Sequence, residues 1–186
     1  LASDREGLKN ELITRLTRDG KKPTPVQVEG ALFSIERSAT TLQTLGIIEQ
    51  LGGKAHYLAC DVTNPGLIDE AIQKIKDAEG HIDVFLHAAG MERSRKLEMK
   101  PIDEFRLVVS VKADGFFNLF KAMEAKGILP RGMVFFSSVA GRFGNSGQTD
   151  YSAANDLLCK IASAVRNQYP GIKAVAIDWS AWGGVG

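Results

Sequence analysis

The sequence has no excess of charge of either sign, and this absence excludes some classes of partner. It carries 23 basic and 22 acidic side chains in 186 residues, which gives a formal net charge of +1. Binding to nucleic acid or to an anionic membrane surface usually requires a basic surplus. The composition therefore predicts no nucleic acid and no membrane partner, and it favours small or neutral ligands.

Cysteine and long apolar runs are also scarce. Cys60 and Cys159 lie far apart and lack C-x-x-C spacing, so we expect two buried thiols in a reducing compartment and no metal site. No apolar run approaches 18 residues, and the opening "LASDREGLKNEL" is charged from its fourth residue, unlike a signal peptide. We therefore expect a cytoplasmic protein.

Short apolar runs recur beyond residue 53. They are rich in β-branched or aromatic residues and have the length of buried strands. Helical patterns separate them, and one of these begins with a proline after an Asp-Val-Thr-Asn turn. The predicted strands are 54–60, 83–89, 133–138 and 173–179, and the predicted helices are 65–78, 101–125 and 150–169.

This alternation predicts right-handed βαβ units and a parallel sheet covered on both faces. The fold class is therefore α/β, with a Rossmann-like doubly wound sheet. In such sheets ligands bind beyond the carboxyl ends of the strands. The loops at those positions are polar or rich in glycine: "CDVTN", "HAAGMERS", "SSVAGRFGNSGQ" and "WSAWGGVG".

The first part of the chain has a different character. Residues 1–45 are rich in charge and prone to form helices, with one break at "GKKPTP", so two or three helices are expected there. We assign residues 1–53 to a helical insertion or linker region of the same domain. Residues 54–186 form its predicted core, and a hydrophobic content of 44% is sufficient for one globular domain.

A polar constellation stands out in "FFSSVAGRFGNSGQTDYSAAN", residues 135–155. The loop after the predicted strand brings Ser138 back beside Tyr151, and Asn155 falls on the same helix face as Tyr151. A phenol ordinarily has a pKa near 10, so it needs a neighbouring cation to exchange a proton near neutral pH. Lys112 is the candidate, because an unpaired charge in the apolar helix "LVVSVKADGFFNLF" is costly.

Each of these residues also has an ordinary structural interpretation. Lys112 can extend its ammonium to solvent from the apolar helix. Tyr151 can be an aromatic residue at a helix start, and Ser138 can be a loop hydroxyl that bonds to backbone. The pattern alone leaves these alternatives open.

Taken together, these blocks resemble the short-chain dehydrogenase/reductase superfamily, and specifically ketoreductase domains of type I polyketide and polyunsaturated fatty acid synthases. The resemblance covers residues 54–186 and rests on "HAAG", "FFSSVAG", "GQTDYSAAN" and "DWSAWGGVG", which occur in the family's order. Tyr-x-x-x-Asn replaces the commoner Tyr-x-x-x-Lys of the superfamily. Synthase ketoreductases carry the lysine on the preceding helix, where Lys112 in "SVKADGFFNL" matches it.

The resemblance implies reduction of a β-ketoacyl thioester, bound through phosphopantetheine to acyl carrier protein, with NADPH as cofactor and neighbouring synthase domains as partners. Tyr151 would protonate the carbonyl oxygen while NADPH delivers hydride to the carbon, and Ser138 would hydrogen-bond that oxygen. Lys112 would favour the ionised phenol and hold the ribose or a chain of waters. Asn155 would orient this relay.

The resemblance also implies cofactor contacts. Asp61 and Val62 in "CDVTN" would bind adenine, although Asp61 can equally cap a turn before the next helix. The small residues of "HAAG" would let the backbone approach the cofactor closely, although a tight strand exit also selects small residues. The loop near "WGGVG" would receive the nicotinamide carboxamide, or can be a flexible linker. These cofactor contacts are Ala88, Ala89, Gly90, Trp182 and Gly183, together with Lys112 and Tyr151.

The sequence departs from the family in two respects. No glycine-rich phosphate loop follows a first strand, so we expect the chain to lack its first βαβ unit and to be truncated at both ends. The segment after "HAAG" is "MERS" instead of Leu-Asp-Asp, and Phe143 replaces the tryptophan of the opposite stereochemical class. Two alternatives therefore stay open: a free-standing reductase of small ketones, and a non-catalytic structural fragment.

Other residues are given structural roles. The basic segment "ERSRK", residues 92–96, is expected to be a solvated loop, with docking of an acidic acyl carrier protein as the alternative. The histidines are expected to pack or to face solvent, and three phenylalanines at helical spacing are expected in the core. These residues are His56, His81, His87, Phe116, Phe117 and Phe120.

Overall fold

The structure, a computed structural model, describes residues 4–17 and 21–181. The chain forms two compact units, Leu1–Leu58 and Ala59–Gly186. Trp182 and Gly183, predicted to contact the nicotinamide, lie outside the described residues.

The first unit is built from two helices, α1 (Arg5–Leu16) and α2 (Pro25–Gln50). Helix α2 begins with a capping box, in which the Thr24 hydroxyl accepts from the Gln27 amide and the Gln27 side chain accepts from the Thr24 amide. Leu12, Val28 and Leu32 form a small buried cluster between the helices. Two helices are therefore present among the described residues of this unit, within the two or three predicted, and they lie on either side of the predicted break.

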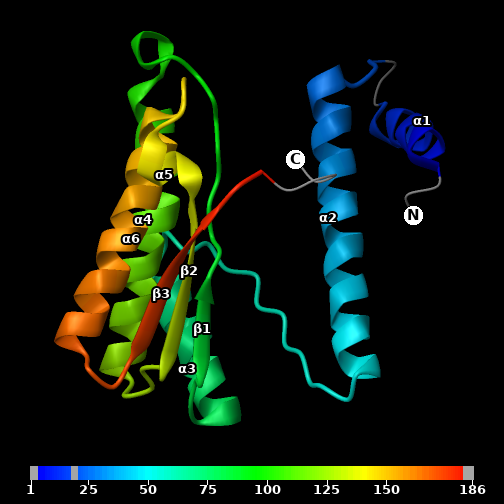
Figure 1. The fold of residues 1–186 in the computed structure, drawn as a ribbon. Helices are drawn as coiled ribbons and strands as arrows, with labels where there is room; N and C mark the ends of the chain where they lie inside the picture. Colours follow the sequence, from blue (N-terminus) through cyan, green and yellow to red (C-terminus); the bar gives the residue numbers. More distant parts are fainter. Residues whose placement is uncertain (1–3, 18–20, 182–186) are drawn as a thin grey trace. The chain divides into compact units, whose positions relative to one another are not determined.

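The second unit holds a parallel sheet of three strands in the order β1-β2-β3 (Figure 1). These strands are β1 (Val84–His87), β2 (Gly132–Ser138) and β3 (Lys173–Trp179). The helices α3 (Pro65–Glu79), α4 (Ile102–Ala125) and α6 (Thr149–Gln168) alternate with them, while a 3-10 turn, η2 (Leu97–Met99), and the short α5 (Val139–Phe143) lie in the connections. This order confirms the predicted α/β fold class.

One predicted strand is absent. Residues 54–60 form no strand, and Tyr57 and Leu58 within them are exposed. If the chain lacks its first βαβ unit, residues 54–60 correspond to the third strand of a doubly wound sheet of order 3-2-1-4. In that order the third strand pairs only with the second. No other strand of the described residues lies beside 54–60, so its backbone groups have no ladder to join.

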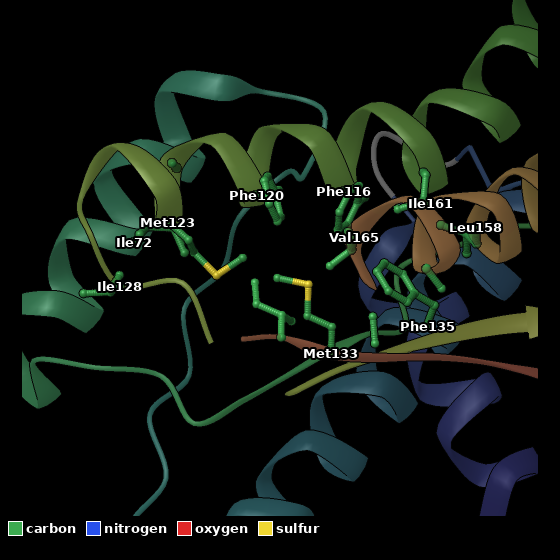
Figure 2. Packing of buried hydrophobic residues seen from close by; sticks show 14 of the residues in the cluster. Ile72, Phe116, Phe120, Met123, Ile128, Met133, Phe135, Leu158, Ile161 and Val165 are labelled. Atoms are coloured by element: carbon green, nitrogen blue, oxygen red, sulfur yellow. The ribbon is translucent and has the colours of Figure 1, made fainter. Parts of the chain in front are cut away.

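The core lies between the sheet and the helices α4 and α6 (Figure 2). Met133 and Phe135 of β2 point into it, and Phe135 packs edge-on against Phe116 of α4 with ring centroids 5.1 Å apart. Alternate positions such as Val84 and Leu86 of β1 are exposed, so the expected burial of both sheet faces does not hold for these residues. Phe116 and Phe120 are buried as predicted, whereas Phe117 is 42% exposed, which corrects its assignment to the core.

Candidate active site

A cavity of about 810 Å³ opens beyond the carboxyl ends of the three strands. This is the edge at which the α5 helix begins, directly after β2 (Figure 1). Its walls come from the loop after β1, from α4, from the end of β2, from the start of α6 and from the residues after β3. The predicted residues that line it are Ala88, Gly90, Lys112, Ser138 and Tyr151.

Lys112 is a buried cation on α4. It is only 4% exposed, and its Nζ donates a hydrogen bond of 2.9 Å to the carbonyl oxygen of Phe136. Burial lowers the pKa of Lys112 from 10.5 to about 8, because the charged form loses hydration. The interpretation in which Lys112 extends to solvent is therefore wrong.

Gly90 makes room for this lysine. A Cβ atom placed on Gly90 would lie 2.8 Å from Lys112 Cε and 3.0 Å from Lys112 Nζ. Both distances are shorter than a normal van der Waals contact. The glycine of "HAAG" thus lets the lysine side chain pass beside the loop into the cavity.

Tyr151 lies in the first turn of α6, and its ring faces Lys112 with the ammonium 5.8 Å from the ring centroid. This distance is within the range of a cation–π contact. The phenol hydroxyl makes no hydrogen bond to the residues that the structure describes. It is therefore open to a ligand in the cavity.

Asn155 supports the tyrosine from the next turn of α6. It is fully buried, and its Nδ2 donates to the Tyr151 carbonyl oxygen at 2.7 Å. The Asn155 carbonyl oxygen in turn accepts from Ser137 Oγ at 3.0 Å. The Oδ1 atom of Asn155 is buried and has no hydrogen-bond partner among the described residues.

Ser138 ends β2 and caps α5. Its Oγ accepts from the Ala140 amide at 3.2 Å, which leaves the hydroxyl proton for a ligand. The preceding Ser137 points to the other side of the strand, because successive side chains alternate across a sheet. Ser137 also borders the cavity, but its hydroxyl is bonded to the Asn155 main-chain carbonyl oxygen, so Ser138 is the serine whose hydroxyl proton is left for a ligand.

Lys112, Ser138 and Tyr151, which come from three separate elements, therefore line one cavity. Together they can hold a carbonyl oxygen, stabilise developing negative charge on it and give it a proton. The described residues contain no cluster of three or more histidine, cysteine or acidic side chains that could hold a metal ion.

The predicted adenine contacts lie away from this cavity's lining. The Asp61 carboxylate accepts from the amide and hydroxyl of Thr63 at 2.9 and 2.8 Å, and these bonds lower its pKa. The Val62 side chain packs at Gly115 of α4, where an added Cβ would lie 2.8 Å from Val62 Cγ2. Asp61 therefore forms the turn that was the alternative interpretation, and its adenine contact stays a prediction, as does that of Val62.

Sequence reasoning missed an ion pair beside the site. Lys100, which follows η2, lies 2.6 Å from both carboxylate oxygens of Asp150, and both side chains are 1% exposed. The signal available was weak, because a charged residue at a helix start usually faces solvent. The one feature of Asp150 visible in the sequence is that it directly precedes Tyr151.

The loop after β1 is bound to the loop before α6 at further points. Gln148 Nε2 donates to Glu92 Oε1 at 3.0 Å, and the Arg95 amide donates to the Gly147 carbonyl oxygen at 2.8 Å. Arg93 and Arg95 both pair with Glu104 of α4. Two of the cations in the basic segment 92–96 thus already form ion pairs with an acidic residue of the same chain.

The remaining sequence expectations concern cysteines and histidines. Cys60 and Cys159 are free thiols that are half-buried, less enclosed than predicted. His87 is buried and its Nε2 lies 2.8 Å from the Lys112 carbonyl oxygen, which confirms a packing role. Within the described ranges, no helix combines the length and the apolar character needed to cross a membrane.

Comparison with known proteins agrees with this arrangement. A profile of the KR domain family matches residues 9–184. A polyunsaturated fatty acid synthase polypeptide of Thraustochytrium sp. is 34% identical over 167 residues, which are 89% of this chain and 6% of that protein. Polyketide synthase PksM of Bacillus subtilis is 29% identical over 135 residues, which are 73% of this chain and 3% of that protein.

Solved structures show the same likeness. A ketoreductase domain from the bacillaene assembly line matches with a TM-score of 0.70 and 27% identity over 76% of this chain and 34% of that chain. An N-terminal ketoreductase from the macrolactin assembly line matches with a TM-score of 0.71 and 29% identity over 77% of this chain and 29% of that chain. The chain thus spans a small part of its curated relatives and about a third of these domains. It belongs to the KR domain family, the ketoreductase domains of type I polyketide and polyunsaturated fatty acid synthases.

Proposed function

We propose that residues 54–186 are the catalytic core of an NADPH-dependent β-ketoacyl reductase. Its substrate would be a β-ketoacyl thioester carried by acyl carrier protein, and its product the β-hydroxyacyl thioester. The observation that carries the proposal is the meeting of Lys112, Ser138 and Tyr151 at one cavity. Family membership supports it, because the chain's relatives are parts of polyketide and polyunsaturated fatty acid synthases.

The chain's own residues would handle the carbonyl oxygen. The Ser138 hydroxyl would donate a hydrogen bond to it, and Tyr151 would give it a proton, so that the ketone becomes a secondary alcohol. The Lys112 ammonium would stabilise the Tyr151 side chain as a phenolate after it has given up its proton. Bound NADPH would supply the hydride for the carbonyl carbon and leave as NADP⁺.

The residues present fit the reactive end of a nicotinamide cofactor. The small residues Ala88 and Gly90 line the cavity, and the hydroxyl of Tyr151, which lines it too, has no partner among the described residues. Lys112 would hold the ribose, and Asp61 and Val62 would contact the adenine. Ala89, with its small neighbours, would let the backbone approach the cofactor, and Trp182 and Gly183 would lie toward the carboxamide. The choice of NADPH over NADH rests on the family resemblance.

The partners and compartment follow from the same proposal. Acyl carrier protein would present the substrate on a phosphopantetheine arm, and other synthase domains would flank this one. The free thiols of Cys60 and Cys159 suit the reducing cytoplasm that the sequence favours.

The test is the substrate preference of the full-length natural protein that contains these residues. With NADPH present, we expect reduction of a short β-ketoacyl thioester at a kcat/KM well above that for simple ketones. Preference for a small ketone would instead favour a free-standing reductase. A lack of reduction of either class, with the protein folded, would overturn the proposed activity.

A non-catalytic role of this segment is the second candidate, favoured by one observation. No glycine-rich turn of the phosphate-binding kind joins a strand to a helix among the described residues. Titration of NADPH against the 186-residue chain tests this, and we expect weak binding or none. Sub-micromolar affinity would show that the chain binds its cofactor without such a loop.

A further inference from the structure

A buried ion pair joins two walls of the cavity. Lys100 Nζ lies 2.6 Å from each oxygen of the Asp150 carboxylate and donates a third hydrogen bond of 2.8 Å to the Arg93 carbonyl oxygen. Both side chains are 1% exposed. The ammonium thus has all three of its protons placed, which fixes its position between the two segments.

The pair lies directly beside the proposed proton donor. Asp150 precedes Tyr151 in the first turn of α6, and its Oδ1 also accepts a hydrogen bond of 2.9 Å from the Tyr151 amide. Lys100 precedes α4, the helix that carries Lys112. One contact therefore links the start of α4, the loop after β1 and the backbone of Tyr151.

Stability alone does not account for a pair of this kind. Removing two charges from water is costly, and well-packed apolar side chains of similar volume often serve stability equally well or better. What a bidentate ion pair adds is direction, because its hydrogen bonds hold only in one arrangement of the two segments. The neighbouring bond between Gln148 and Glu92 joins the same loops but is exposed to solvent.

We propose that Lys100 and Asp150 are a positioning pair, which fixes the backbone of Tyr151 so that its phenol meets the Lys112 ammonium and the substrate carbonyl. This inference rests on the proposed reductase function. Neither residue of the pair touches the reacting atoms. The pair acts on turnover through Tyr151 and leaves substrate binding nearly unchanged.

The test replaces both charges at once in the full-length natural protein. Lys100→Met with Asp150→Leu removes the directional bonds and leaves no unpaired buried charge, so the protein is expected to fold. Because a displacement of about 1 Å in a reacting group can cost about 100-fold in rate, we expect kcat to fall roughly 10- to 100-fold with KM changed less than about 3-fold. Asp150→Asn keeps the shape and one acceptor but leaves the buried Lys100 ammonium without its carboxylate, so we expect a lower Tm together with a loss of kcat in the same direction.

A control is the ion pair between Lys126 and Asp69, which joins the end of α4 to α3 away from the cavity at 2.7 Å and is more exposed than the Lys100–Asp150 pair. Lys126→Met with Asp69→Leu should leave kcat unchanged. A second readout needs no turnover: hydrogen–deuterium exchange should quicken in peptides covering 91–101 and 149–153 of the Lys100/Asp150 variant, and not in the control.

The outcomes separate the two ideas. If the natural protein reduces no thioester, the proposed function fails, and the exchange of the two peptides still tests whether the pair holds Tyr151. If the wild type is active and the folded double variant keeps its kcat, or if exchange is unchanged, the positioning role is overturned. Loss of folding in both the double variant and Asp150→Asn assigns the pair to stability and overturns it as well.

Discussion

Lys112 and Tyr151 come from different helices, yet the lysine Nζ lies 5.8 Å from the centroid of the tyrosine ring at the end of the sheet. The cation belongs to helix α4, and the phenol belongs to the first turn of α6. Asn155 holds the Tyr151 carbonyl oxygen from below. The relationship joins a buried charge to an open hydroxyl, and the chemistry proposed for the site depends on it.

Tyr151→Phe should abolish most of the reduction. The phenol is the proposed proton donor, and loss of a positioned general acid costs about 100- to 10,000-fold in rate. The ring remains, so its contact with Lys112 and the fold of α6 should persist. Steady-state kinetics of the natural protein with a β-ketoacyl thioester measure the loss, and NADPH titration should give an unchanged Kd. Unchanged turnover would refute the assignment of Tyr151.

Ser138→Ala should lower kcat by about 100- to 1,000-fold, as expected when one hydrogen-bond donor to a developing oxyanion is removed. It should also cost about 1 kcal/mol of stability, because the Ala140 amide loses its cap. Ser137→Ala is the matched control: its hydroxyl bonds the Asn155 carbonyl oxygen on the other side of the strand. The control should lower the Tm while retaining most of kcat, and equal losses of kcat in both variants would contradict the assignment.

Gly90→Ala tests the space around the lysine. The new methyl group would meet the end of the Lys112 side chain at 2.8 to 3.0 Å, so the flexible lysine must move while the backbone stays in place. We expect a loss of kcat of about 10-fold or more from the displaced cation. The Tm should change little. Gly46→Ala on α2, where no atom lies within 4 Å of the added Cβ, should stabilise the chain by about 0.5–1 kcal/mol and serves as the control.

Local sequence signals predicted most of the regular elements. Helix α3 begins where Asn64 caps it and Pro65 occupies its first position, and both signals are visible in "DVTNPG". Strand β3 matches its predicted range, because an apolar β-branched run bounded by turns has few other solutions. The segment 54–60 was predicted as a strand on the same pattern. It forms none, because a strand depends on a hydrogen-bonded neighbour that the local pattern does not specify.

For the candidate site, too, some residues could be predicted from local sequence signals and others could not. Lys112 could be found because a charge in an apolar helix is conspicuous, and Ser138 and Tyr151 because a strand end and a helix start place them together. The Lys100–Asp150 pair could not be found so, because two common charged residues far apart in sequence carry no mark of their pairing. Its burial follows from tertiary packing of the loop after β1 on α6.

The buried charge of Lys112 makes stability depend on pH. Its pKa falls from 10.5 to about 8 in the folded chain because burial disfavours the ammonium, a difference that corresponds to about 3 kcal/mol. Below pH 8 the lysine is charged in both folded and unfolded states, and the folded state carries the full penalty. Between pH 8 and 10.5 the unfolded chain binds more protons, so the free energy of unfolding gains a positive slope with pH from this group.

Lys112→Met should therefore stabilise the protein near pH 7 while abolishing reduction. The expected gain is about 1–3 kcal/mol, since the lost bond to the Phe136 carbonyl oxygen offsets part of the relieved penalty. Comparing Lys112→Met with its parent in a Tyr151→Phe background removes the neighbouring phenol. His87, whose pKa is lowered by burial and by the Lys112 charge, is already neutral above pH 7 and does not contribute to the difference there. Denaturant unfolding should show the gain shrinking as the pH rises from about 7 toward 10.5, because the wild-type lysine becomes neutral. A gain that is constant over this range, or a loss of stability near neutral pH, would show that the ammonium of Lys112 is not desolvated in the folded chain.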